Sequence, residues 1–271
     1  MRPIIAFTIA VLALTPLSGD QGPAHPKNTK GILLEDLTWV EAKDRLTGDA
    51  VVVIPLGAAA KEHGPHLRLR NDWTMAEYLK RRVLAQARVV VAPTLNYFFY
   101  PAFVEYPGST SLRLETARDL VVDVCRSLAH HGPRRFYVLN TGVSTTRPLE
   151  AAARLLADEG IVLRFTDIIA AAEPIVKQIS RQKEGTHADE IETSMMLYID
   201  ERSVDMSKAA RDYPTGEGKL TPNQDQPGGY SPTGISGDAT LATREKGRKV
   251  VEATVQAVLK DIEDLRRTPL P

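Results

Sequence analysis

Four short segments of this chain are apolar at nearly every position, and this feature constrains the fold most. They read VVVI at 51–54, RVVVAP at 88–93, RRFYVLN at 134–140 and IVLRFTD at 161–167. A continuous apolar run is typical of a strand that is buried on both faces of a sheet. The segments 72–87, 114–130 and 148–157 lie between them and carry apolar residues at helical spacing. This alternation predicts an α/β fold with a mainly parallel sheet and helices on both faces.

The beginning of the chain reads like a secretory signal peptide over residues 1–24. Arg2 precedes an apolar stretch at 4–14 that is too short to span a bilayer, and small residues follow it. We therefore expect a polar leader at 25–30, a single domain at 31–271, and export to the periplasm or the extracellular space. An uncleaved anchor is the alternative interpretation of the same segment.

The charge and cysteine content exclude several classes of protein. Lys+Arg and Asp+Glu are 34 each, and the chain has no basic tract of the kind that binds nucleic acid. No stable membrane span is expected once the signal is removed. The single cysteine, Cys125, lies in the apolar phase of a predicted helix, so we expect it in the core, and no internal disulfide can form.

Reactive side chains are expected where the parallel strands end, because loops at the carboxyl ends of such strands meet at one edge of the sheet. The stretch AAAKEHGPHLRLRND at 58–72 follows the first predicted strand, and NTG at 140–142 ends and follows the third. His63, His66 and Asp72 offer imidazole and carboxylate ligands for a divalent metal. Alternatively, the histidines hydrogen-bond the turn and Asp72 caps the next helix.

A third segment, GTHADEIETSMMLYI at 185–199, begins as a loop and continues as a helix. Helical spacing places Asp189, Glu192 and Thr193 on one face. Glu192 can therefore point into a site that His187 approaches from the loop. The Pro- and Gly-rich segment 212–238 predicts a long ordered loop or lid, and 241–266 predicts a closing helix.

The stretch PLGAAAKEHGPHLRLRND resembles the signature of the creatininase (creatinine amidohydrolase) family, which reads approximately P-(L/V)-G-S-x-E-Q-H-G-P-H-L-P-L-x-T-D. The resemblance continues through YPGSTSL, VLNTGVSTTRPLEAAARLL, HADEIETS and GDATLATREKG, from about residue 32 to 265. It implies a three-layer α/β/α sandwich, metal-dependent hydrolysis of small cyclic amides or formamide-like bonds, and a compact homo-oligomer.

The resemblance also implies roles for individual residues. His63 and Asp72 match metal ligands of the family, Glu192 is the candidate for a further carboxylate ligand, and His187 resembles its proton-transfer histidine. Two positions depart together, because Lys61 stands where the family has a metal-binding glutamate and Gly142 where it has a metal-binding histidine.

These departures suggest that an ammonium group replaces one of two metal ions. A buried Asp72 carboxylate without a cation would cost several kcal/mol, and Lys61 offers the compensating charge. We therefore predict one divalent metal held by His63, Asp72 and Glu192, with zinc as the first choice and manganese or iron as alternatives.

The predicted activity is hydrolysis of a C–N bond in a small amide, cyclic amides included, by a metal-activated water. His187 or Glu190 would relay the proton to the leaving nitrogen. The alternative is a catalytically inactive, metal-free protein with a binding or structural role.

Four residues are candidates for contact with a small-molecule substrate. His66 lies among the predicted ligands, and Tyr97 belongs to an aromatic cluster after the second strand that could line a pocket or pack between subunits or loops. Ser144 and Thr145 follow the third strand and could donate hydrogen bonds to a substrate carbonyl, or cap the next helix.

Overall fold

The structure is a computed structural model that describes residues 29–270. The predicted signal peptide, residues 1–24, lies outside the described residues. Within 29–270, every helix is too short or too polar to cross a membrane.

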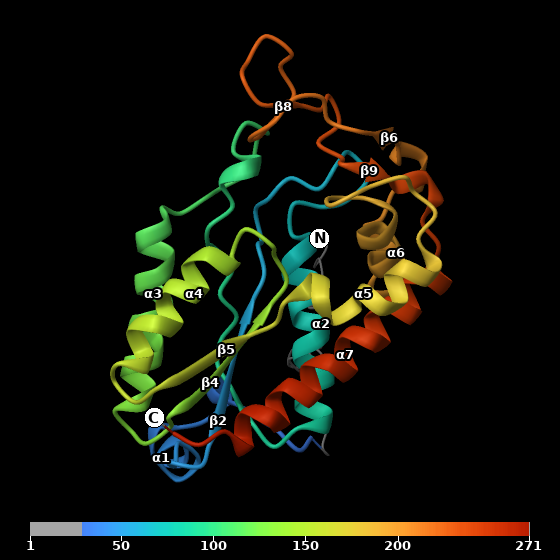
Figure 1. Cartoon of the computed structure of the whole chain (residues 1–271). Coiled ribbons are helices and arrows are strands. Elements are labelled where there is room, and N and C mark those ends of the chain that lie inside the picture. The colour runs from blue at the N-terminus through green and yellow to red at the C-terminus, as the bar shows by residue number, and fades with distance from the viewer. Residues whose placement is uncertain (1–28, 271) are drawn as a thin grey trace, which may run out of the picture.

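A five-stranded parallel sheet forms the centre of the molecule (Figure 1). The strand order is β1-β3-β2-β4-β5. The strands are β1 (Ile32–Leu33), β2 (Val51–Leu56), β3 (Val90–Val91), β4 (Arg135–Asn140) and β5 (Val162–Phe165). Its longest pairing joins β2 to β4 in parallel from Val51↔Arg135 to Leu56↔Asn140. Four of the five strands coincide with the apolar runs that predicted them.

Helices cover both faces of the sheet, as the alternating sequence pattern predicted. The long helices are α2 (Asn71–Gln86), α3 (Leu114–Ala129), α4 (Thr146–Ala157), α5 (Ile168–Ile179), α6 (Glu190–Ile199) and α7 (Arg244–Arg267). Figure 1 shows α3 and α4 on one side and α2, α5 and α7 on the other. The predicted three-layer α/β/α class is confirmed.

Successive residues of β2 point to opposite layers, which explains why the strand is apolar throughout. Val52 and Ile54 pack with the core under α3 and α4. Val51 and Val53 pack with the core under α2, α5 and α7. Cys125 of α3 is fully buried in the first of these cores, and burial raises the pKa of its thiol, so it packs as a small apolar side chain as expected.

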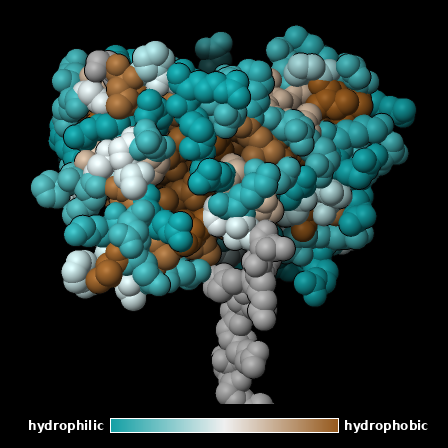
Figure 2. Space-filling view, turned by 90° about the horizontal axis from the view of Figure 1, so that it is seen from below, coloured by the Kyte–Doolittle hydropathy of each residue, from teal (hydrophilic) through white to brown (hydrophobic). Residues whose placement is uncertain are grey.

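Helix α1 (Trp39–Arg45) and the segment 212–238 were less readable in the sequence. Helix α1 buries none of its residues and leaves Trp39 79% exposed. Its sequence therefore lacks the apolar spacing that marks a helix packed on the core. The segment 212–238 forms short pairs, β6 (Arg211–Asp212) with β9 (Gly237–Asp238) and β7 (Leu220–Thr221) with β8 (Gly229–Tyr230). Figure 2 shows the face at which the strands begin; it is hydrophilic around its edge, with hydrophobic side chains mainly across the middle.

Candidate functional site

Three segments that are distant in the sequence meet beyond the carboxyl ends of β2 and β4, as predicted. Thr141, directly after β4, donates a hydrogen bond from Oγ1 to the Leu56 carbonyl at the end of β2, at 3.0 Å. The turn before α6 joins them, because His187 Nε2 lies 3.0 Å from the carbonyl oxygen of Glu62. The site is therefore built on the end of the sheet.

Gly57 allows the first turn of α2 to lie against the end of β2. A Cβ atom at this position would be 2.3 Å from the carbonyl oxygen of Asp72 and 2.9 Å from the Cβ of Ala76. Real Cβ atoms do not approach backbone oxygen this closely, so only glycine permits this packing. It carries the Asp72 side chain to the loop that follows β2.

Replacing Gly57 with alanine should therefore displace the start of α2. We expect a loss of about 1–3 kcal/mol in the free energy of unfolding, the typical cost of overpacking. Denaturant unfolding measures this change. Gly48→Ala is a matched control, since a Cβ at Gly48 meets nothing within 4 Å. Equal stability of the two variants would contradict the packing argument.

Lys61 and Asp72 form a buried ion pair at the centre of the site. Lys61 Nζ lies 2.7 Å from Asp72 Oδ2, and the two side chains are 6% and 1% exposed. The ammonium also lies 4.8 Å from the ring centroid of Phe103 and 5.4 Å from that of Tyr100, where aromatic faces favour a cation. Burial raises the pKa of Asp72, but the charges of Lys61 and His63 outweigh this effect and lower it. The predicted proximity of Lys61 to Asp72 is thus present in the structure.

The polar contacts of His63 require a positive species at its Nε2 atom. Nδ1 lies 2.9 Å from the Lys61 carbonyl, which only accepts, so Nδ1 carries a hydrogen. Nε2 faces two carboxylate oxygens, Asp72 Oδ1 at 2.8 Å and Glu192 Oε1 at 3.3 Å. Burial and Lys61 lower the pKa of His63, but the two carboxylates raise it to about 9. Either a proton or a metal ion on Nε2 satisfies this arrangement.

His63, His187 and Glu192 form a group whose ligand atoms all lie within 4.8 Å of one another, the spacing of a possible metal site. Glu192 is held in place by hydrogen bonds from Asn71 Nδ2 at 2.9 Å and from the Ala188 amide at 2.7 Å. Burial raises its pKa, yet His63 and His187 keep it well below the usual range. The Glu192 side chain is 19% exposed, whereas those of His63 and His187 are 0% and 6% exposed.

The structure divides the predicted metal ligands into two neighbouring sets. His63 and Glu192 come together as expected, and His187 joins them. Asp72 contacts His63 but directs its other oxygen to Lys61. Among the described residues, the group with the spacing of a metal site comprises Glu192 and the two histidines, without Asp72.

Glu62 is a member of this site that the sequence did not reveal. Its Oε2 lies 3.0 Å from His187 Nε2, and the side chain is 8% exposed. Neighbouring side chains leave the chain in different directions, so Lys61 meets Asp72 whereas Glu62 meets His187. An acidic residue beside a predicted buried ligand was the only available signal.

Glu190, a candidate for proton transfer, lies outside this group. Its carboxylate accepts hydrogen bonds from the backbone amides of Arg181 at 2.8 Å and Gln182 at 2.7 Å, and it forms an ion pair with Lys246. Asp189 caps α6 by accepting from the amide of Glu192, which turns Glu190 toward α7. These contacts direct the Glu190 carboxylate to the backbone of residues 181–182 and to Lys246.

The candidate substrate residues are also engaged elsewhere. His66 Nε2 pairs with Thr193 Oγ1 at 2.8 Å, and burial lowers the pKa of His66 to about 4, which keeps the ring neutral. Thr145 donates to Asn140 Oδ1 at 2.7 Å, so it ties the loop rather than capping α4. Ser144 donates to the Phe99 carbonyl at 3.3 Å. Tyr97 is 51% exposed and outside the buried cluster.

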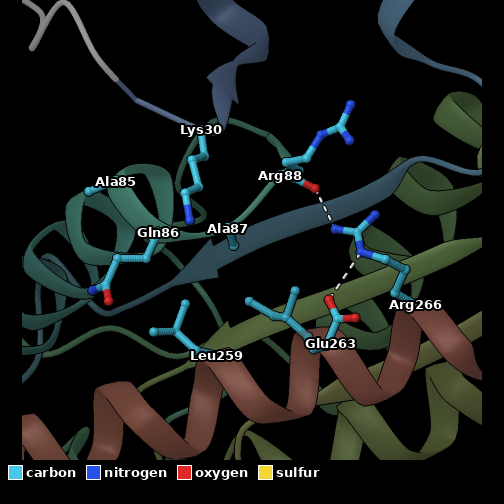
Figure 3. A pocket seen from close by; sticks show the side chains of 9 residues that line it. Lys30, Ala85, Gln86, Ala87, Arg88, Leu259, Glu263 and Arg266 are labelled. Atoms are coloured by element: carbon cyan, nitrogen blue, oxygen red, sulfur yellow. Dashed lines mark hydrogen bonds and ion pairs between the residues drawn. The ribbon is translucent and has the colours of Figure 1, made fainter.

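Two surface hollows have walls that do not include His63, His187 or Glu192. Figure 3 shows one of about 610 Å³ between the end of α2 and α7, with Lys30 and Arg88 on its wall. These two residues precede β1 and β3, so this hollow lies at the amino ends of the strands, opposite the site. The other, of about 290 Å³, includes Thr186 next to His187 and is closed by residues 213–236. Only the second adjoins a site segment.

Comparison with known sequences gives consistent matches over most of the chain. A family model described as creatininase, creatinine amidohydrolase, matches residues 35–262. A creatinine amidohydrolase of Pseudomonas putida is 28% identical over 258 residues, which cover 87% of this chain and 98% of that protein. A mycofactocin precursor peptide peptidase of Mycobacterium ulcerans (strain Agy99) is 29% identical over 233 residues, which cover 81% and 86% of the two chains.

Solved structures show the same similarity in three dimensions. A crystal structure of creatinine amidohydrolase (creatininase) aligns with a TM-score of 0.73 and 25% identity, covering 89% of this chain and 100% of that one. A structure described as creatininase Mn aligns with a TM-score of 0.72 and 26% identity over 88% and 100% of the two chains. A creatininase variant of the Zn-Zn type gives a TM-score of 0.72 and 26% identity over 88% and 99%.

Proposed function

Because this chain belongs to the creatininase family, whose model covers residues 35–262, we propose that it is a metal-dependent hydrolase that cleaves a C–N bond in a small amide. The observation that carries the proposal is the convergence of His63, His187 and Glu192. Two imidazoles and one carboxylate are a ligand set of hydrolytic zinc sites, in which a coordination position stays open. A divalent ion held there supplies an activated water and polarises the carbonyl under attack.

The donor groups fit such an ion. His63 Nε2 already faces two carboxylate oxygens, a position that calls for a cation. Imidazole suits zinc, and the carboxylate of Glu192 also suits manganese. The structures described as creatininase Mn and as Zn-Zn type concern those proteins, and they support zinc and manganese as the ions to try first.

Lys61 takes the place of a second ion in this proposal. Its ammonium lies 2.7 Å from Asp72 Oδ2, so the carboxylate is neutralised without a metal. Gly142 offers no side chain as a ligand, and a Cβ there would be 3.1 Å from the Thr145 side chain.

We expect purified protein supplied with zinc or manganese to retain about one ion per chain. His63, His187 and Glu192 can hold that ion, and Lys61 takes the place of the second ion. Inductively coupled plasma mass spectrometry on desalted protein measures the ratio. A ratio near two would overturn the replacement by Lys61. A ratio near zero would support the second candidate, a metal-free binding protein, which the Lys61–Asp72 ion pair itself favours.

The variant Lys61→Glu tests the role of Gly142 by the same measurement of the metal ratio. It restores a carboxylate, but Gly142 still lacks an imidazole, so we expect the ratio to stay near one. Two ions in this variant would show that our interpretation of Gly142 is wrong.

Activity is tested by screening the metal-loaded protein against small lactams, formamides and cyclic ureas. Glu192→Gln keeps the size of the side chain and removes a ligand charge, so it should abolish any turnover found. Turnover that survives in Glu192→Gln and in the presence of chelator would refute a metal-dependent reaction.

A further inference from the structure

We propose that Glu62 is a positioning residue that fixes the ring orientation and tautomer of His187, so that His187 Nδ1 faces the metal position. The metal part of this inference rests on the proposed function.

The hydrogen bonds of His187 define which ring nitrogen carries the proton. Nε2 lies 3.0 Å from the carbonyl oxygen of Glu62 and 3.0 Å from its Oε2. A carbonyl and an ionised carboxylate only accept, so Nε2 must donate. Nδ1 then points to the other side of the ring, where Glu192 Oε2 lies at 3.7 Å. A histidine that binds metal commonly donates its second N–H to a carboxylate in this way.

Packing fixes the plane of the same ring. The Phe103 ring lies against it with a centroid distance of 4.2 Å, and the His63 ring centroid is 5.0 Å away. The His187 backbone is bonded to Ser236, whose amide donates to the His187 carbonyl at 2.9 Å. These contacts leave the His187 ring little freedom to rotate, so Glu62 acts on a ring whose plane is already restricted.

The Glu62 carboxylate is itself held in place by hydrogen bonds and by close packing. The Gly64 amide donates to Oε1, and the Glu62 amide donates to Ser109 Oγ at 2.9 Å. Gly234 closes over the carboxylate, because a Cβ at that position would be 2.1 Å from Oε1. Gly234 also has φ of +79°, which favours glycine. The loop between β8 and β9 thus leaves space for this carboxylate.

A carboxylate suits this position better than an amide. Oε1 faces the Gly64 N–H, and Oε2 faces the His187 N–H beside the Glu62 backbone carbonyl, so each carboxylate oxygen lies opposite a donor. Glutamine has one oxygen and one NH2 group, and one of the two donors would face that NH2 group. The negative charge also makes the His187 ring a stronger electron donor toward a metal.

The test compares Glu62→Gln with Glu150→Gln, an exposed control on α4. Zinc affinity is measured by competition with a chromophoric chelator, and 15N chemical shifts of labelled histidines report the protonation of His187 Nε2 and Nδ1 in chelator and with zinc. We expect Glu62→Gln to weaken zinc binding by about 10–100-fold and to reduce the share of the Nε2–H form, and Glu150→Gln to change neither.

Gly234→Ala provides an independent variant, because it displaces the carboxylate without altering its charge. It should change zinc affinity and the His187 shifts in the same direction as Glu62→Gln. Unchanged affinity and unchanged shifts in both variants, or a wild-type His187 with its proton on Nδ1 alone, would overturn the role of Glu62. If wild-type protein binds no zinc, the proposed function fails. The 15N chemical shifts of His187 measured in the presence of chelator still test whether Glu62 orients this ring.

Discussion

Asp72→Asn should lower the free energy of unfolding of the metal-free protein by about 3–5 kcal/mol, the usual cost of removing one partner of a buried ion pair. Lys61 Nζ loses the oxygen that lies 2.7 Å away, and its side chain is only 6% exposed. His63 loses a charged acceptor at 2.8 Å at the same time. An asparagine of similar size cannot neutralise either cation. Guanidinium unfolding in the presence of chelator measures the change.

The double variant Lys61→Met, Asp72→Asn is the control for this interpretation. Removing the ammonium as well should recover much of the lost stability, because the cost comes from an unpaired buried charge. A loss below about 1 kcal/mol in Asp72→Asn, or a double variant less stable than the single one, would show that the ion pair does not stabilise the fold as argued.

His63→Gln should weaken zinc binding by more than about 100-fold, beyond the range expected for residues that only orient a ligand. His63 Nε2 contacts both Asp72 and Glu192, and it is the atom that faces the proposed metal position. Chelator competition measures the affinity, and the activity found in the amide screen should disappear with it.

His66→Gln is the matched control for metal affinity. His66 is buried in the same loop, but its Nε2 pairs with Thr193 and its ring is not part of the ligand group. We expect zinc affinity to change by less than about fivefold, since no ligand is removed. Equal losses in the two variants would mean that damage to the loop, rather than removal of a ligand, explains the result.

The parts of the site that could be predicted from the sequence are contacts between residues that are close together in the chain. His63 and Asp72 lie nine positions apart, on either side of one turn and the start of one helix, and the structure places His63 Nε2 2.8 Å from Asp72 Oδ1. Lys61 was expected beside Asp72 because it stands where the resembling family has a metal-binding glutamate and because a buried carboxylate needs a cation, and the two form an ion pair. That expectation rested on the resemblance together with the cost of burying charge.

Long-range packing limited what the sequence revealed about Glu62 and Glu190. Glu62 meets His187 across 125 positions, and Glu190 meets Lys246 across 56. Contacts between residues so far apart in the chain leave no local pattern in the sequence. Glu190 lies closer in sequence to His187 than Glu62 does, yet the Asp189 cap directs it away.

The amino-acid sequence by itself determined the parallel sheet and the edge at which the reactive loops gather. Apolar runs are buried on both faces because helices must cover both sides of such a sheet, and this requirement is visible residue by residue. Only the tertiary structure decided which distant groups Glu62 and Glu190 meet. Those contacts depend on the directions in which side chains leave α6 and the loops, and they pair Glu190 with Lys246 and Glu62 with His187.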